Sequence, residues 1–261
     1  MSSIRIFFVG GLTSYRALFG WLSPWILIPT FCIAPLFQIL LFAYIGRTTH
    51  LESDKFYVVG NALQYASLPC LFAMAQTIDG ERYQKTLSVI LATPAPRLPL
   101  FLGRSLPVIA NGILVSAFAF TVGALLLGVH VPTGSLGSLA LVIAVTAFAC
   151  TGLGLVNAAV GLRFRDTAVS SNLFFGFLLV FCGVNVPLHE LPGWMSNLAQ
   201  GVPLTHGIEA ARKLADGSSL GDVRRLVAAE AFIGLIYATV GYGCIRLVER
   251  VSRQRAALEV A

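Results

Sequence analysis

LGSLALVIAVTAFACTGLGLVNAAVGL, residues 136–162, is a run of 27 residues without a charged side chain. About 20 apolar residues of α-helix cross the hydrocarbon core of a bilayer. A buried helix of a soluble protein rarely stays uncharged over such a length. The run therefore predicts a transmembrane helix.

Five further windows of the sequence are long and apolar enough to cross a membrane. Four of them contain no charged residue and the last contains only Glu230; they cover residues 21–45, 56–78, 105–129, 167–188 and 226–245. With the last helix extended to residue 248, the windows predict an all-α membrane protein with six transmembrane helices in a domain of residues 21–250. Residues 251–261 would form a cytoplasmic tail.

The composition of the whole chain excludes a soluble enzyme. Hydrophobic residues make up 56% of the 261 residues and charged residues only 11%, whereas an average soluble domain is about 25% charged. Six helices use about 120 positions, which leaves no room for a soluble catalytic domain. The net charge of +6 indicates orientation in the membrane rather than nucleic-acid binding.

The basic residues predict the orientation of the helices. With the N-terminus in the cytoplasm, 12 of the 18 basic residues fall in the inner segments, so the positive-inside rule places both termini in the cytoplasm. Residues 1–20 carry apolar residues at three- and four-residue steps. This pattern predicts an amphipathic helix that lies in the cytoplasmic interface of the membrane. An irregular extension of the first transmembrane helix fits the pattern as well.

No motif for ATP binding or catalysis is present. The phosphate-binding motif G-x-x-x-x-G-K-[ST] is missing, because Lys55, Lys85 and Lys213 follow Asp, Gln and Arg. The five cysteines and four histidines have no metal-ligand spacing. We therefore expect no catalytic, cofactor-binding or metal-binding residue in this chain. Ion-coupled transporters usually place ionisable side chains within the membrane, and here only Glu230 lies within a predicted span. The energy for any transport would therefore come from a partner protein.

The longest inner connection, residues 79–104, begins with a candidate docking helix over residues 79–94. Asp79 would cap this helix and Glu81 would lie in its first turn, where negative charge is favourable. An apolar stripe and a terminating proline follow, formed by Leu87, Ile90, Leu91 and Pro94. A short amphipathic helix of this kind suits a groove of another protein, and it also suits a lipid surface.

This connection resembles a known family. Glu81-Arg82, Thr86-Leu87 and Thr93-Pro94 are similar to the Glu-Arg-x-x-Gly-Thr-Leu-x-x-Leu-x-x-x-Pro stretch of ATP-binding-cassette export permeases of the second exporter type, the ABC-2 family. That family includes antibiotic-resistance permeases and nodulation-factor exporters, and in it the stretch is the coupling helix that contacts a separate ATPase subunit. Lys85 stands where Gly is usual, and Ser88 where an acidic residue is common.

A second block, after the fifth span, resembles the same family. Residues 186–194 (VPLHELPGW), 203–206 (PLTH) and 209–212 (EAAR) are similar to the family's F-P-x-x-x-L-P-x-W … N-P-L-T-x-x-x-E-x-x-R block, with Val202 in place of the usual Asn. The resemblance implies an outer gate over residues 188–212. Its candidate residues are Pro187, Glu190, Pro192, Gly193, Trp194, Pro203, Thr205 and Glu209.

The residues of this block also predict short helices without reference to any family. Residues 191–208 are uncharged, but their prolines and glycines forbid one straight span. Irregular backbone at membrane depth is tolerated only where protein or a water-filled cavity covers it. Two short re-entrant helices in the outer leaflet, with Trp194 at the interface, fit these constraints. An ordinary external loop with an amphipathic helix is the alternative.

The short inner connection after the fourth span carries Arg163, Arg165 and Asp166. In the family, an Arg-Asp pair at this place lies beside the ATPase subunit. The alternative interpretation is that the arginines only keep this connection in the cytoplasm, as the positive-inside rule requires.

The fifth span carries Phe174, Phe177 and Phe181 at three- and four-residue steps. The resemblance implies that this face lines the substrate path between two permease copies. A lipid-facing or core stripe has the same spacing.

Small residues and one ionisable side chain predict contacts between spans. Gly152, Gly154 and Gly161 on the fourth span would let neighbouring helices approach closely. Glu230 is expected to pair with Arg224-Arg225 at the outer end of the sixth span.

These features predict the permease subunit of an exporter in the bacterial inner membrane. By resemblance it pairs with a second permease copy or a paralogue and with two cytoplasmic ATPase subunits, which hold ATP and Mg; the chain itself is not an enzyme. The predicted substrate is an amphipathic or hydrophobic drug or natural product, and a lipid-linked sugar or polysaccharide is the alternative. A secondary transporter and a membrane assembly factor are the competing classes.

Overall fold

The described residues form helices and no strand. The computed structural model describes Trp25 and residues 28–83, 97–163 and 167–259, and the all-α fold class is confirmed over them. The elements in chain order are η1 (Pro29–Ile33), α3 (Ala34–Thr49), α4 (Asp54–Tyr83), α6 (Arg97–Leu127), η2 (Thr133–Ser135), α7 (Leu136–Arg163), α8 (Thr167–Phe181), η3 (Leu188–Glu190), α9 (Gly193–Ala199), α10 (Thr205–Ala215) and α11 (Leu220–Glu259).

Five helical segments in this part of the chain are long and apolar enough to cross a membrane. They are Pro29–Thr49, Asp54–Gln76, Gly103–Leu127, Thr133–Gly161 and Leu220–Leu247. These segments overlap five of the six predicted windows. The helix predicted over residues 1–20 lies outside the described residues.

The remaining predicted window, residues 167–188, is only partly helical. α8 has 15 residues and ends at Phe181, so it is about 22 Å long, against about 30 Å of hydrocarbon core. The chain turns at Gly183, whose φ of 71° is left-handed, and Pro187 has no N–H to continue a helix. The prediction of one straight helix over residues 167–188 is therefore wrong beyond Phe181.

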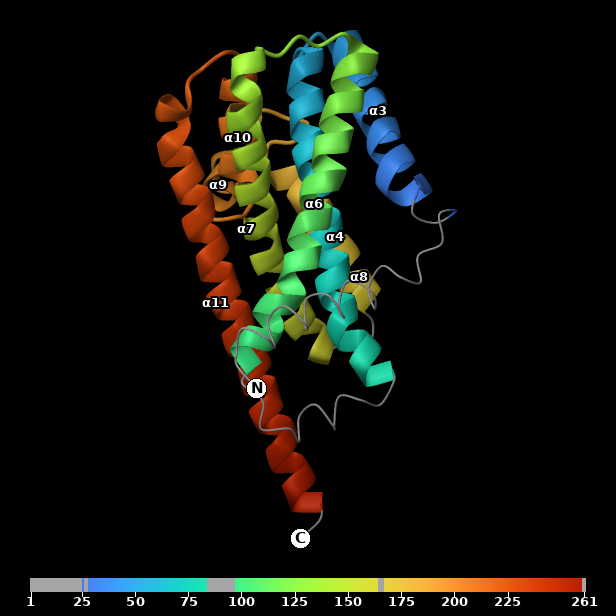
Figure 1. Ribbon diagram of the computed structural model, residues 1–261, viewed down its shortest axis with the longest axis vertical. Helices are drawn as coiled ribbons and strands as arrows, with labels where there is room; N and C mark the ends of the chain where they lie inside the picture. Colours follow the sequence, from blue (N-terminus) through green and yellow to red (C-terminus); the bar gives the residue numbers. More distant parts are fainter. Residues whose placement is uncertain (1–24, 26–27, 84–96, 164–166, 260–261) are drawn as a thin grey trace.

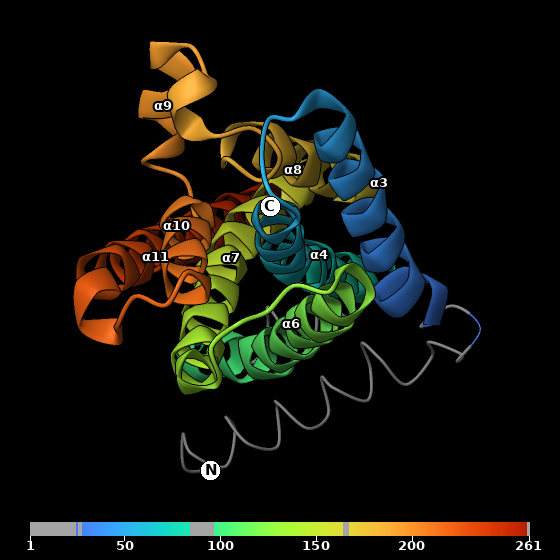
Figure 2. The same cartoon turned by 90° about the horizontal axis from the view of Figure 1, so that it is seen from above.

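α4 lies at the centre of the helical bundle. It contacts α3, α6, α7, α8 and α10, and 89% of its most apolar window is buried. Figure 2 shows α3, α6, α7 and α8 around α4, with α11 on the far side of α7. The helix continues to Tyr83, so Asp79 lies inside α4 and does not cap a separate helix. Gly80, the one weak helix former nearby, costs only about 1 kcal/mol in a helix.

The bundle has two distinct ends (Figure 1). We call the end with residues 50–53, 128–132 and 216–219 the loop end. α4, α7 and α11 run from it toward the opposite end, which we call the tail end.

Glycines on α7 let three neighbouring helices approach closely. A Cβ added at Gly152 would lie 2.5 Å from the carbonyl oxygen of Gly234 on α11, and one at Gly154 would overlap the carbonyl oxygen of Cys70 on α4. A Cβ at Gly161 would overlap Thr167 at the start of α8. The prediction that these three glycines allow close helix packing is confirmed.

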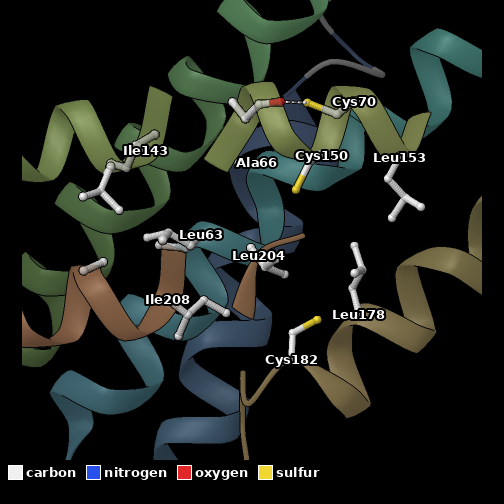
Figure 3. Packing of buried hydrophobic residues seen from close by; sticks show 14 of the residues in the cluster. Leu63, Ala66, Cys70, Ile143, Cys150, Leu153, Leu178, Cys182, Leu204 and Ile208 are labelled. Atoms are coloured by element: carbon white, nitrogen blue, oxygen red, sulfur yellow. Dashed lines mark hydrogen bonds between the residues drawn. The ribbon is translucent and has the colours of Figure 1, made fainter. Parts of the chain in front are cut away.

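An apolar core forms where α4, α7, α8 and α10 meet. Figure 3 shows Leu63 of α4, Ile143 of α7, Leu178 of α8 and Ile208 of α10 converging on it, and all four are buried. The outward faces are apolar as well: Leu125 is 76% exposed and Leu173 is 70% exposed. Such faces suit lipid or another membrane subunit.

Candidate functional site

The connection between α8 and α10, residues 182–204, is folded rather than extended. It contains η3 and α9, and Pro187 and Pro192 stand directly before these two helices. It turns at Gly183 and again at Leu204, both with positive φ. The two short helices predicted from the prolines and glycines are present as α9 and α10. Their depth in a membrane stays a prediction.

The predicted gate residues divide into an exposed and a buried group. The exposed residues are Glu190, Pro192, Gly193 and Trp194, and the buried ones are Pro187, Pro203 and Thr205. Glu209 lies one turn before Lys213 on α10 and forms an ion pair with it at 2.8 Å. The structure thus places these residues along one connection and its following helix, but it does not gather them into one cluster.

Three aromatic rings join α8 to α9, and we call them the aromatic stack. Phe177 and Phe181 stack with ring centroids 4.3 Å apart, and Phe181 meets the ring of Trp194 edge-on at 6.0 Å. One residue of the predicted substrate path, Phe181, therefore contacts one residue of the predicted gate, Trp194. Phe174, the third predicted path residue, is half-buried against the apolar core.

Arg212 fastens α10 to two other segments. Its guanidinium donates hydrogen bonds to the carbonyls of Gly183 and Val184 at 2.8 and 2.9 Å and to that of Phe56 at 3.2 Å. The guanidinium carbon lies 3.3 Å from the centroid of the Phe56 ring. Burial lowers the pKa of Arg212 to about 9, so the side chain keeps its charge near neutral pH. Carbonyl dipoles and a ring face compensate that charge.

Glu230 is fully buried in α11 and binds the N-terminus of α10. Its carboxylate oxygens accept hydrogen bonds from the backbone N–H groups of Leu204 at 2.6 Å and Gly207 at 3.0 Å. The expected pairing with Arg224-Arg225 is wrong, and both arginines are exposed. Residues five and six positions apart do not share a helix face, which explains the difference.

A cluster of amide side chains connects α3, α4 and the residues after α8. Gln38 donates to Asn61 at 2.8 Å and to Gln64 at 2.5 Å, and Asn61 donates to Asn185 at 2.7 Å. Asn61 and Gln64 are fully buried. Sequence reasoning missed this cluster. Its signal was four amide side chains within three apolar windows of the sequence, since a polar group in lipid requires a partner.

A second polar contact, also missed, joins α7 to α8. Asn157 donates to the Ser171 hydroxyl at 2.7 Å and to the Leu71 carbonyl at 3.3 Å, and it accepts a hydrogen bond from Ser170 at 2.7 Å. Asn157 and Ser171 are buried. The contact fixes the position of α8, the helix that carries Phe177 and Phe181 of the aromatic stack.

The predicted ATPase-coupling residues lie only partly within the described residues. Asp79, Glu81 and Arg82 belong to the last turns of α4, and Arg163 is the last residue of α7, so these positions share the tail end (Figure 1). The other predicted coupling residues lie outside the described residues; they are Thr86, Leu87, Ile90, Leu91, Pro94, Arg165 and Asp166.

Metal-binding chemistry has no support in the described part of the chain. No group of three His, Cys, Asp or Glu side chains there could hold a metal ion. What the geometry does offer is a bundle with apolar outer faces, internal polar contacts and a folded connection after α8.

Comparison with models of protein families identifies the family to which most of the chain is similar. Residues 15–215 match the family described as ABC-2 type transporter. The matched stretch extends through α10, and it includes the residues between α4 and α6 and the aromatic stack. No curated protein matches the chain.

Proposed function

This chain belongs to the ABC-2 type transporter family, and on that premise we propose that it exports an amphipathic or hydrophobic compound across the inner membrane of a bacterium. Membership makes it a multi-pass membrane permease, a subunit type that typically lacks ATPase activity and works with an ABC ATPase. The proposed transporter contains two ATPase subunits, which hold ATP and Mg, and a second permease copy or paralogue.

The proposed topology has both termini in the cytoplasm and six crossings. α8 and the connection after it would form the remaining crossing, because three oxygen atoms at the start of that connection are bound by protein: Arg212 binds the carbonyls of Gly183 and Val184, and Asn61 binds the side-chain oxygen of Asn185. Covered backbone of this kind is tolerated at membrane depth. The tail end would then face the cytoplasm, as the excess of basic residues supports.

Residues 79–94 are proposed to receive the movement of the ATPase. They begin in the last turns of α4, the central helix that contacts five neighbours. Arg163 is the last residue of α7 at the same end, and Arg165 and Asp166 follow in the sequence. A displacement at the end of α4 would therefore reach much of the bundle through its packed neighbours.

The aromatic stack is the observation that carries the proposed route of the substrate. It links α8 to α9 and leaves Trp194 65% exposed, so apolar ring surface extends from the bundle to its exterior. Such surface suits an apolar or amphipathic compound. Residues 188–212 would act as the outer gate at the end of this route.

The substrate proposal is tested by stimulation of ATP hydrolysis. Proteoliposomes containing the chain and the ATPase of the same transporter are given a panel of amphipathic drugs and, separately, a lipid-linked oligosaccharide. We expect drugs to stimulate hydrolysis. Phe181→Ala should weaken that stimulation about 2- to 10-fold, because the substrate would lose its contact with one aromatic ring. Phe232→Ala, at a side chain on α11 that is 62% exposed, is the control and should change nothing.

Stimulation by the oligosaccharide alone would contradict the substrate class and support the glycan alternative. Equal effects of Phe181→Ala and Phe232→Ala would contradict the proposed route, because any loss would then be unrelated to the aromatic stack.

A further inference from the structure

α10 begins without a cap of its own. The residue in the capping position is Leu204, and no side chain near in sequence accepts a hydrogen bond there. Ser, Thr, Asp or Asn usually occupies this position, because its side-chain oxygen binds an N–H of the first turn. Leu204 is also fully buried and has a φ of 89°, which residues with a Cβ rarely adopt. Something outside α10 must hold this turn.

Glu230 supplies the missing acceptor from a different helix. Its two carboxylate oxygens bind the N–H groups of Leu204 and Gly207 at 2.6 and 3.0 Å. A buried carboxylate is costly unless it is compensated, and here two N–H groups and the positive end of a helix dipole compensate it. The acceptor on α11 lies 26 residues from Leu204 in sequence, so the bond joins two elements.

The first turn of α10 lies in a seat formed by three segments. Glu230 of α11 is the first part, and Thr146 of α7 is the second, because a Cβ added at Gly207 would overlap its side chain. Cys182, directly after α8, is the third: its thiol donates to the Pro203 carbonyl at 3.6 Å. Figure 3 shows Cys182 beside Leu178, close to Leu204 and Ile208.

We propose that Glu230 is a positioning residue that fixes the first turn of α10 to α11, so that the connection with the aromatic stack follows α11 as one unit. α11 has 40 residues and reaches furthest toward the tail end (Figure 1). A movement of α11 would therefore reach the first turn of α10 through this carboxylate, which binds the N–H groups of Leu204 and Gly207. The consequence for transport rests on the proposed function, whereas the link between the helices does not.

Cys182 provides a native reporter of this seat. Its thiol is buried and faces the residue before Leu204, so it becomes accessible when the first turn of α10 leaves α11. In the full-length chain, Cys32, Cys70, Cys150 and Cys244 are replaced by Ala, and the rate of N-ethylmaleimide labelling of Cys182 is measured in detergent. The rate follows the population of the open seat when the seat recloses quickly.

We expect Glu230→Gln to raise the labelling rate about tenfold or more. The amide has only one oxygen, so one backbone N–H loses its acceptor and faces another N–H. Glu230→Asp keeps the carboxylate but shortens its reach by one methylene group, and it should label at an intermediate rate. Glu230→Asp is the more conservative variant, so its labelling rate tests the proposal if Glu230→Gln fails to fold.

Two further variants separate positioning from general stability. Ile245→Ala removes a fully buried side chain from the same helix; it should lower the melting temperature and leave the labelling rate unchanged. Glu230→Ala combined with Leu204→Asn returns a cap to its usual position, in a residue type that tolerates positive φ. This double variant has no link to α11, so we expect its labelling to stay fast.

The proposal is overturned if Glu230→Gln and Glu230→Asp label at the rate of the parent chain. It is equally overturned if Ile245→Ala accelerates labelling as much as Glu230→Gln does, or if the local cap restores slow labelling. Neither ATP nor an ATPase takes part in the measurement, so its result is independent of the proposed export function.

Discussion

Arg212 and Glu230 place opposite charges inside the bundle, and each binds backbone groups. Arg212 binds three carbonyls, those of Phe56, Gly183 and Val184, and Glu230 binds two N–H groups. Carbonyl oxygens before a turn and N–H groups at a helix start have no partner within their own element. The carbonyls of Gly183 and Val184 and the two N–H groups would otherwise stay unpaired, whereas the carbonyl of Phe56, in the first turn of α4, also has a donor within its own helix.

Replacing Arg212 should destabilise the fold rather than only weaken an activity. Arg212→Ala leaves the carbonyls of Gly183 and Val184 without this donor, which we expect to cost about 2–4 kcal/mol and to lower the melting temperature in detergent by about 5–10 °C. Arg212→Lys should recover only part of this loss, because a single ammonium group cannot reproduce the planar fork. Size-exclusion chromatography after heating provides the measurement.

Arg225→Ala is the matched control, since Arg225 is exposed at the start of α11. A melting temperature unchanged in both Arg212→Ala and Arg225→Ala would mean that the carbonyls of Gly183 and Val184 find other donors, and it would refute the assigned role.

At the scale of elements, the close contact between α7 and α11 depends on glycines, which have no side chain to hold the two backbones apart. A Cβ at Gly234 would lie 2.6 Å from the Cα of Ala149, and one at Gly241 would lie 2.7 Å from the backbone nitrogen of Val156. Apolar side chains gain little by leaving lipid for a helix interface, so close backbone approach and van der Waals packing hold such helices together.

Two glycines on α11 should respond differently to the same substitution. Gly234→Ala forces α7 and α11 apart and should destabilise the chain by about 1–3 kcal/mol. Gly243→Ala meets nothing within 4 Å and should be neutral or stabilising by up to about 1 kcal/mol, because Ala is the better helix former. Melting temperatures of the two variants test this contrast, and a stabilising Gly234→Ala would show that the helices do not pack here.

The long helices could be predicted from sequence, because a long uncharged apolar run is enough to identify a membrane-spanning helix. The close helix packing at Gly152 could be predicted as well. The end of α8 could not, because residues 167–188 are uniformly uncharged and the turn depends on Gly183 and on carbonyls bound by Arg212. The partner of Glu230 was mispredicted, since a cap from a distant helix leaves no local signal. The amide cluster of Gln38, Asn61 and Gln64 was visible as residue types but not as contacts.

On the scale of the whole molecule, the two ends of the bundle are expected to face opposite sides of the membrane. Connections at the loop end are short, and the described positions proposed for coupling lie in the last turns of α4 and at the end of α7, at the tail end. The excess of basic residues in the inner segments of the predicted topology supports a cytoplasmic tail end.

Thiol labelling in intact cells tests this orientation. In a chain without native cysteines, Gly134→Cys places a thiol in open space at the loop end, and a membrane-impermeant maleimide should label it from outside. Ala257→Cys should react only after the membrane is permeabilised. The opposite pattern would reverse the proposed topology and exclude residues 79–94 as a contact of a cytoplasmic ATPase.

The central claim, that this permease takes its energy from an ATPase bound at residues 79–94, is tested most directly by the ATPase turnover rate in proteoliposomes. We predict that Leu87→Asp, which puts a charge into the apolar stripe, abolishes complex formation and lowers stimulated turnover at least about tenfold. Ser88→Asp places the same charge at the adjacent position, where the family commonly has an acidic residue, and turnover should be retained. A Leu87→Asp chain that binds the ATPase and supports the turnover of the unmodified chain would contradict the account.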